Sequence, residues 1–393
     1  MLTFAADWLN LLIRWAHMVV GIGWIGASFY FIGLDVSLKK REIMNPGVYG
    51  TAWEVHGGGF YHVEKYMVAP TSLPEDLIWY KWEAYLTFMT GFVLLIVQYY
   101  FNPQAYLVDQ NVAHLYSWQA IGISIAGLAA GWFAYDRLCR SAIGNNTGVL
   151  AVAVFALIVA AAWAFTHVFS GRGALIHVGA FVGTIMAANV FQIIIPNQKK
   201  IVASLLKGEE PDPALGAIGK QRSVHNTYLT LPVLLMMVSN HYPMLTNHPQ
   251  SWLLIALVLI IGGMVRHFFV RHEAGDHVQT ILWAPGIAAV ALLVALILTA
   301  PRTDPALAGL AVTDAEVLAL TTKHCTPCHA DKPTREGFAE APKGVKFGSV
   351  EALRRYAPLI MVQAVNSDTM PLGNETGMTV DERKKLGAWL SRP

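Results

Sequence analysis

The pentapeptide Cys325-Thr326-Pro327-Cys328-His329 has the residue types and spacing that attach haem c. In a C-x-x-C-H motif both thiols bond covalently to the porphyrin, and the histidine becomes an axial ligand of the iron. A second axial ligand is expected downstream, and Met370 is the candidate. The alternative is a zinc or dithiol site, but zinc needs two further ligands, and the remaining cysteine, Cys139, lies in an apolar stretch. The motif therefore predicts one covalent haem c with His329 and Met370 as iron ligands.

The residues around this motif, from 309 to 393, have the length and order of a small cytochrome c with one haem. Thr313 and Glu316 form a capping box, which predicts a short helix leading into the motif. Thr379 and Glu382 form a second capping box, before a helix whose apolar residues would pack on the first helix. Because haem c is attached to exported proteins, this part of the chain indicates a periplasmic or equivalent location.

The rest of the chain has the composition of a membrane protein. Of 393 residues, 54% are hydrophobic and 14% are charged, whereas about a quarter of the residues in a soluble domain are charged. Eight apolar stretches are long enough to cross a bilayer as helices, at 8–34, 78–101, 115–135, 149–169, 174–196, 228–244, 252–269 and 279–300. The sequence thus predicts an all-α fold, with a polytopic eight-helix transmembrane bundle in residues 1–300, a linker at 301–308 and a fused cytochrome c domain at 309–393.

Lysine and arginine are distributed unequally among the predicted connections. The connections at 35–78, 136–147, 197–223 and 266–278 contain 13, whereas the first seven residues and the other connections contain only Arg172. Since basic loops stay in the cytoplasm, both termini are predicted to be periplasmic, at a bacterial inner membrane. The first stretch lacks a basic leader and a cleavage site, so we interpret it as a retained span. The net charge of +2 gives no indication of a nucleic-acid partner.

Polar side chains within the apolar stretches are candidates for function, because they are costly in a bilayer. The predicted topology sorts them into two layers. The periplasmic layer contains Arg14, His17, His167 and His177. Such a histidine has three interpretations: a hydrogen-bonded strut between helices, a ligand of a haem b, or part of a proton path. His17, His167 and His177 are the candidate ligands of a haem b.

The cytoplasmic layer combines carboxylate, amide, imidazole and guanidinium groups, at Glu83, Asn189, Gln192, His225, Asn226 and Arg266. His225 and Asn226 follow Arg222 closely, so they offer a base, an amide and a cation together, although Asn226 is alternatively a helix cap. His56 precedes three consecutive glycines, whose free amides suit an anionic or planar polar ligand. A flexible surface loop is the alternative interpretation of that segment.

Together these features resemble the membrane-bound, cytochrome c-linked urate oxidases, or urate hydroxylases, of bacterial purine catabolism. The resemblance covers essentially the full length and depends on the haem motif and on residues 14–17, 56–61, 82–85, 195–198 and 222–226. It implies oxidation of urate to 5-hydroxyisourate. Electrons would leave through the haem c to a soluble cytochrome or a terminal oxidase, and no hydrogen peroxide would form.

Oxidation of urate needs a base for an N–H proton, amide and cationic groups at the ring edge, and an oriented water. We therefore expect His225, Asn226 and Glu83 to be catalytic, and Asn189, Gln192, Arg266 and His56 to bind the substrate. The alternatives are a quinol or other small-molecule dehydrogenase and a membrane-anchored electron-transfer subunit. About 30 Å of hydrocarbon would separate a cytoplasmic site from the haem c. Either the substrate binds in the periplasmic layer, or a second redox centre such as haem b bridges the gap.

Overall fold

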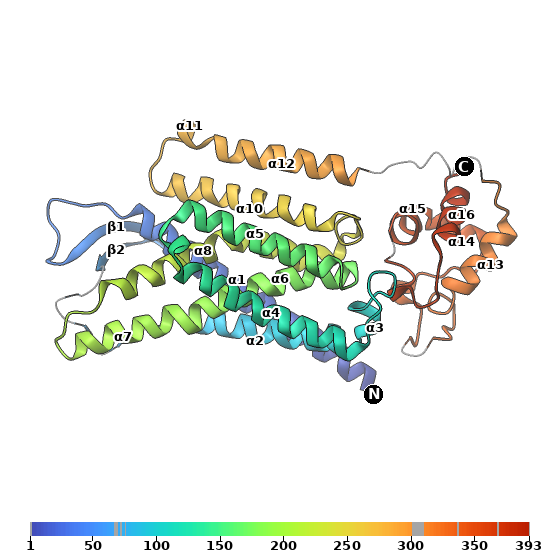
Figure 1. The fold of residues 1–393 in the computed structure, drawn as a ribbon, viewed down its shortest axis with the longest axis horizontal. Coiled ribbons are helices and arrows are strands. Elements are labelled where there is room, and N and C mark those ends of the chain that lie inside the picture. The colour runs from blue at the N-terminus through green and yellow to red at the C-terminus, as the bar shows by residue number, and fades with distance from the viewer. Residues whose placement is uncertain are drawn as a thin grey trace.

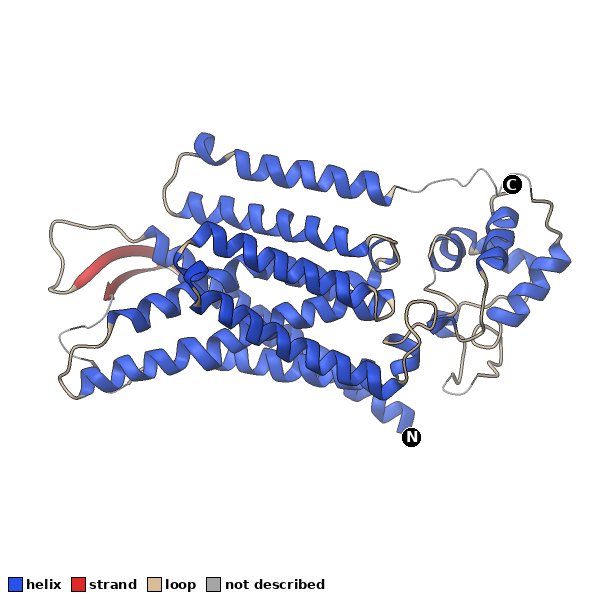
Figure 2. Cartoon of the chain, viewed as in Figure 1, coloured by secondary structure: helices blue, strands red, loops and turns tan. Residues whose placement is uncertain are grey.

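The computed structural model describes residues 2–66, 70, 73–74, 76–300, 310–335, 338–367 and 369–392, with side chains from residue 8 onward. The predicted linker at 301–308 lies outside the described residues. Long helices lie side by side in a bundle, a β-hairpin extends from one end, and residues 310–392 gather beside the other end (Figure 1). We call the end of the bundle that carries the hairpin the hairpin end and the opposite end the tail end. Residues 310–392 are called the tail. The chain is mostly helical (Figure 2).

Each of the predicted apolar stretches contains one long helix. These helices are α1 (Leu2–Ser37), α2 (Trp82–Leu95), α4 (Ser117–Arg140), α5 (Thr147–Thr166), α6 (Gly171–Ala188), α8 (Pro213–Val238), α10 (Ser251–Glu273) and α12 (Trp283–Thr299). Within the described part of the chain, four helical stretches are long and apolar enough to cross a membrane: Trp8–Ser37, Thr147–Thr166, Gly171–Leu206 and Ser251–Glu273. Trp283–Thr299 is also apolar but shorter.

Helix α8 begins fifteen residues before the predicted stretch at Tyr228. Asp212 caps it, because its carboxylate accepts a hydrogen bond from the Ala214 amide at 2.9 Å, and Pro213 occupies the first helical position. Apolar composition alone hides this start, because the polar residues from Lys220 to Ser223 interrupt the first half of α8. Asn226 therefore lies inside the helix, and its interpretation as a helix cap is wrong.

Two long helices contain π-helical turns, which are often found at functional sites. The turn η1 (Ile96–Tyr100) extends α2, and η3 (Asn189–Ile194) joins α6 to α7 (Ile195–Leu206). Pro196 follows η3 and supplies no amide to the preceding turn, which gives a local reason for the irregular helix. The shorter helices and turns are η2 (Ala142–Asn145), α3 (Pro103–Tyr106), η4 (Ser239–His241), α9 (Pro243–Thr246) and α11 (Val278–Ile281).

The hairpin corrects the prediction of a purely helical fold. Strands β1 (Val48–His56) and β2 (Gly59–Tyr66) pair antiparallel, with His56 opposite Gly59. Gly57 and Gly58 form the two-residue turn with φ of +60° and +81°, a conformation that favours glycine at both positions. The glycine run is therefore explained by the hairpin turn, and the segment is a regular β-hairpin and not an irregular loop.

The tail forms its own small core. Its elements are α13 (Asp314–His324), η6 (Pro342–Gly344), α14 (Val350–Arg355), α15 (Ala357–Ile360), η7 (Met361–Val365), η8 (Leu372–Asn374) and α16 (Val380–Leu390). Both predicted capping boxes are confirmed, at Thr313 with Glu316 and at Thr379 with Glu382. Helices α13 and α16 pack together, and the Trp389 indole donates a hydrogen bond to Asp314 at 2.7 Å.

The α16 capping box makes tail stability sensitive to acid. Hydrogen bonds from the Thr379 backbone amide, and next from the Lys323 side chain, lower the pKa of Glu382 from 4.5 to about 2. A carboxylate with a lowered folded-state pKa stabilises the fold above its unfolded-state pKa, and that stability is lost as pH falls toward the folded-state pKa. We expect Glu382→Gln to unfold more readily than wild type at pH 7, and the difference to shrink between about pH 4.5 and pH 2. Limited proteolysis of the tail across this pH range measures the difference between the two proteins. A difference that stays constant with pH would contradict this prediction.

Candidate active site

Polar side chains from α4, η3 and α8 meet in one buried cluster at the hairpin end. The Asn189 amide donates hydrogen bonds to the Tyr135 hydroxyl at 3.0 Å and to Asn226 Oδ1 at 2.9 Å. The Asn226 amide donates to the Met186 carbonyl at 2.9 Å. His225 Nδ1 lies 2.7 Å from the Tyr135 hydroxyl. The structure thus brings together Asn189, His225 and Asn226, which the sequence predicted to lie in one layer, and adds Tyr135.

The hydrogen-bond network assigns the protons in this cluster. Asn189 donates to the Tyr135 oxygen, so the phenolic hydrogen is free to point at His225 Nδ1. A neutral His225 then carries its own proton on Nε2. The phenol and the imidazole form a pair along which one proton can move, which is the arrangement that a general base requires.

A buried cation borders the pair. Arg222 is 1% exposed, its Nη2 donates to Asp136 Oδ1 at 2.8 Å, and its guanidinium carbon lies 4.9 Å from the centre of the Tyr135 ring. Asp136 also accepts a hydrogen bond from Arg140 Nε at 2.7 Å. Among the described residues, Arg222 Nε and Nη1 and Asn189 Oδ1 are buried without a hydrogen-bond partner. Buried donors and acceptors are normally paired, so these three atoms mark a place for a polar ligand.

Gln192, an exposed residue of η3, is linked to the cluster through Trp132. The Trp132 indole donates to Gln192 Oε1 at 3.1 Å, and the Trp132 and Tyr135 ring centres are 6.0 Å apart. A side chain on the neighbouring Gly131 would overlap the Phe181 ring, because an added Cβ would lie 2.0 Å from it. The close contact of α4 with α6 at this glycine positions Trp132 beside η3.

The other predicted site residues at this end lie outside the cluster. Glu83 is half-buried and faces α1, where its Cγ would lie 3.9 Å from a Cβ on Gly23. Arg266 is buried on α10, 4.2 Å above the Phe29 ring and 3.6 Å from Glu273 Oε1. No hydrogen bond or ion pair found among the described residues joins Glu83 or Arg266 to His225. Glu83 therefore has no structural support as a catalytic partner of His225.

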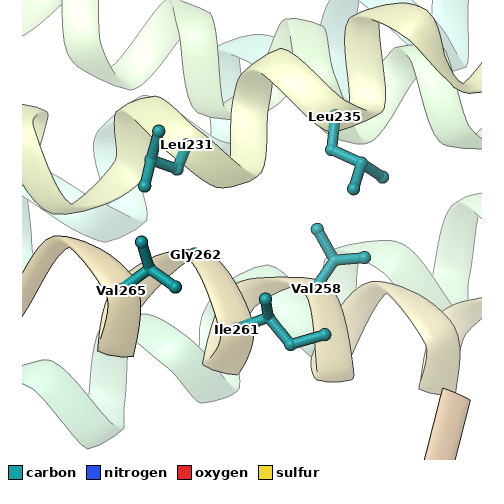
Figure 3. A pocket seen from close by; sticks show the side chains of 6 residues that line it. All are labelled: Leu231, Leu235, Val258, Ile261, Gly262 and Val265. Atoms are coloured by element: carbon teal, nitrogen blue, oxygen red, sulfur yellow. The ribbon is translucent and has the colours of Figure 1, made fainter. Parts of the chain in front are cut away.

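His56 lies in the hairpin turn and is exposed. It lines an open hollow of about 450 Å³ with Tyr30, Glu54, Val55 and Tyr61. The Tyr30 hydroxyl donates to Glu54 Oε2 at 2.6 Å. The carboxylate of Glu54 lines this hollow and would repel an anion, so the hollow is not a favourable site for one. A second hollow, of about 160 Å³, lies between α8 and α10 and is lined by Leu231, Leu235, Val258, Ile261, Gly262 and Val265 (Figure 3). Its lining is apolar, so it suits hydrocarbon and not a polar ligand.

The predicted haem b ligands make separate contacts toward the tail end. His177 is fully buried, and both ring nitrogens are occupied, by the Gly173 carbonyl at 2.6 Å and by the Ser124 hydroxyl at 2.7 Å. His17 Nδ1 lies near the Thr87 carbonyl at 3.1 Å. His167 is exposed and contacts its own helix at the Trp163 carbonyl. Ser124 occupies the ring nitrogen of His177 that an iron would need, so the contacts of His177 fit the hydrogen-bonded strut or the proton path. Ligation of a haem b by His17 and His167 stays a prediction.

The tail residues fit a covalent haem c. Cys325 and Cys328 are free thiols, and His329 Nδ1 lies 2.9 Å from the Val345 carbonyl, which leaves Nε2 available to a metal. Arg383 Nη1 donates to the carbonyls of Ala364, Ser367 and Met370, and so fixes the loop that carries the Met370 thioether. Within the described ranges, no group of three or more His, Cys, Asp or Glu side chains could hold a metal. The zinc alternative therefore has no support in the described residues.

Sequence reasoning alone did not select Tyr135, Trp132 or Asp136. Tyr135 and Asp136 stand where the apolar stretch 115–135 ends. The connection that follows, 136–147, is distinguished in the sequence mainly by its basic residues. The available signal was an acid, Asp136, at the start of an otherwise basic connection, which suggests a buried partner such as Arg222.

The chain was compared with protein families, curated proteins and solved structures. The family model described as Urate oxidase N-terminal matches residues 3–300. The match covers the whole bundle and the hairpin, and ends before the tail. No curated protein and no solved structure matches the chain.

Proposed function

The chain belongs to the Urate oxidase N-terminal family, and on that premise we propose that it oxidises urate to 5-hydroxyisourate in the cluster around Arg222, Asn189 and His225. Family membership supports an oxidoreductase that acts on urate. A haem c held by Cys325, Cys328, His329 and Met370 would accept the two electrons one at a time, and a soluble cytochrome or a terminal oxidase would take them onward. No hydrogen peroxide is formed, because oxygen does not receive the electrons.

The unpaired atoms of the cluster carry this proposal. Urate is a planar anion with carbonyl oxygens and N–H groups along its edges. Arg222 Nε and Nη1 are buried donors without partners, and each of them can donate to an anionic carbonyl oxygen. Asn189 Oδ1 is a buried acceptor without a partner, and it matches a ring N–H. A ligand with carbonyl oxygens and N–H groups would pair with Arg222 and Asn189, whereas a quinol offers no anion to the guanidinium.

In this proposal the His225 and Tyr135 pair acts as the base. Moving the phenolic proton to His225 Nδ1 leaves a phenolate oxygen, which accepts a proton from a urate N–H. The Asn189 amide donates to the same oxygen and stabilises its negative charge. Arg222, whose guanidinium lies against the Tyr135 ring, stabilises that charge as well. Asn226 positions Asn189 by accepting its second N–H.

The long helices support a multi-pass location in a bacterial inner membrane. We propose that α1, α2, α4, α5, α6, α8, α10 and α12 all cross the bilayer, with the hairpin end in the cytoplasm and both termini in the periplasm. The apolar side chains that α12 turns outward, including Val290, Leu293 and Ile297, would then face lipid. The basic connections at the hairpin end agree with this orientation.

Haem c bound to the tail would supply a one-electron acceptor within the same chain. Cys325 and Cys328 would hold it covalently, and His329 and Met370 would ligate its iron. The Val345 carbonyl orients the His329 ring, and Arg383 fixes the backbone of the Met370 loop. Both contacts position ligands without contacting the iron.

Anaerobic addition of urate to the purified full-length protein tests this function. We expect urate to produce the absorbance bands of reduced haem c, and mass spectrometry to identify 5-hydroxyisourate. In air, the same reaction should yield no hydrogen peroxide. Xanthine, which lacks the third ring carbonyl, is the matched control and should leave the haem oxidised. If a quinol reduces the haem and urate does not, the protein is a dehydrogenase with another donor and the proposal is wrong.

A further inference from the structure

A second buried arginine lies on α10, outside the proposed urate cluster. Arg266 is 3% exposed, and its guanidinium carbon lies 4.2 Å from the centre of the Phe29 ring on α1. Among the residues that the structure describes, Arg266 Nε and Nη2 are buried without a hydrogen-bond partner. A buried charge inside an apolar helix is costly unless it is paired, and such residues mark functional sites. The Arg266 side chain therefore has room in its bonding for an anionic ligand.

Glu273, on the same helix, gives Arg266 only a loose ion pair. Its Oε1 lies 3.6 Å from Arg266 Nη1, which is beyond the usual hydrogen-bond range of about 2.7–3.2 Å. Its Oε2 is also buried without a partner. A Cβ on Gly33 would lie 3.2 Å from that oxygen, so a glycine at this point of α1 leaves room for the carboxylate. Two donors and one acceptor are thus open where α1 and α10 pack together.

The positions of these atoms select the chemistry of a ligand. Nε and Nη2 project from one edge of the planar guanidinium, and two parallel N–H groups of this kind bind planar anions in bidentate fashion. The Phe29 ring lies against the guanidinium, so the open approach is along the edge. The unpaired oxygen of Glu273 needs an N–H from the ligand. A simple carboxylate or an inorganic anion lacks that N–H, whereas a purine anion has both groups.

The Arg266 region lies at the same depth in the bundle as the urate cluster. The Tyr228 hydroxyl of α8 lies 2.9 Å from His267 Nδ1, and His267 directly follows Arg266. On α8, Tyr228 is only two residues after Asn226 of the cluster. The Thr227 hydroxyl, between them, lies 3.5 Å from the Ser28 hydroxyl of α1. Helix α8 therefore contacts both regions within one helical turn.

We propose that Arg266 and Glu273 form a second binding site for a planar purine anion, with urate as the ligand, an inference that rests on the proposed function. Arg266 Nε and Nη2 donate to two neighbouring acceptors on the anionic edge of urate, and Glu273 Oε2 accepts a ring N–H. Glu273 is the last residue of α10 and its side chain is 34% exposed, so it can rotate outward to admit the ligand. Each chain then binds two urate molecules.

Equilibrium dialysis of radiolabelled urate against the full-length protein tests this site. The protein is first reduced with dithionite and freed of it by gel filtration under argon, so that bound urate is not oxidised. We expect two urate molecules per chain in wild type. In Arg266→Met, the dissociation constant of one of them should rise at least about tenfold, because two charge-assisted hydrogen bonds are lost. Binding that is unchanged in Arg266→Met would overturn the second site.

Arg271→Met is the matched control on the same helix. Arg271 pairs with Asp276 and its side chain is 49% exposed, so this variant should bind two urate molecules as wild type does. Arg266→Lys keeps the charge and the pair with Glu273 but not the fork, and it should recover only part of the affinity. This variant also decides the matter if Arg266→Met does not fold. Full affinity in Arg266→Lys, or displacement of the second urate by excess acetate, would show a site for small anions and overturn the purine assignment.

The same measurement separates this inference from the proposed function. Arg222→Met should lose the other urate molecule and keep the one at Arg266. If wild type binds a single urate and Arg266→Met abolishes that binding, the Arg266 site stands and the Arg222 cluster is wrong. If urate binds at both sites but does not reduce the haem, the proposed oxidation is wrong and the second site remains.

Discussion

Replacing Arg222 by methionine is expected to lower the rate of urate-dependent haem reduction by about 100- to 1,000-fold, the range for losing one preorganised donor to a developing negative charge. Methionine keeps an unbranched side chain of similar length but removes every N–H and the charge. The unpaired Nε and Nη1 of Arg222 are the donors that we assign to the urate anion. Stopped-flow measurement of haem reduction under argon gives the rate, and urate titration gives the apparent affinity.

Arg140→Met is the matched control for this variant. Arg140 pairs with the same carboxylate, Asp136, but its side chain is 61% exposed and on the surface of α4. We expect Arg140→Met to keep the wild-type rate. Arg222→Lys retains the charge and tests the geometry, because lysine lacks the planar fork and should recover only part of the rate. A wild-type rate in folded Arg222→Met would exclude this cluster as the urate site.

The paired substitution of Cys325 and Cys328 by serine should remove covalent haem completely. A C-x-x-C-H motif holds its cofactor through both thioether bonds, so serine at both positions leaves no covalent attachment. We expect no haem-associated stain after denaturing electrophoresis, and no transfer of electrons from urate to an added cytochrome. Binding of urate should persist, because the proposed site lies at the other end of the bundle.

Cys139→Ser provides the control within the same chain. Cys139 is buried on α4, with its sulfur 4.0 Å from His225 Nδ1, and it belongs to the urate cluster and not to the tail. Its substitution should leave the covalent haem intact. Covalent haem that survives the double substitution in the tail would show that another residue attaches it, and would contradict the assignment of the motif.

Local signals in the sequence sufficed wherever the physical cause is local. The capping boxes of α13 and α16 join residues three apart in the sequence. The sequence pattern therefore predicts the hydrogen bonds directly, without any contact from a distant segment. Apolar length predicted the approximate position of each long helix, because a bilayer-spanning helix must be apolar over about 20 residues, but it did not predict where α8 begins. The hairpin was missed because its aromatic strands are interrupted by charges, and the turn was judged by its glycines alone.

The C-x-x-C-H motif is identified from its covalent spacing alone, and the haem c that it implies stays a prediction. The sequence by itself also narrowed the polar residues to a short set, because each is costly inside an apolar helix. Asn189, His225 and Asn226 belonged to that set, and the structure brings them together.

Only the tertiary structure decided which of these residues form one site. Tyr135 and His225 are 90 residues apart and meet because α4 and α8 both pack against α6. Asn189, at the start of the π-helical turn η3, donates to Tyr135 and to Asn226, whereas Glu83 and His56 lie outside this cluster. The buried N–H groups of Arg222 have no sequence signature, because a lack of partners depends on every neighbouring helix. Sequence spacing determines which side chains share a helix face, but packing between distant segments determines which faces meet.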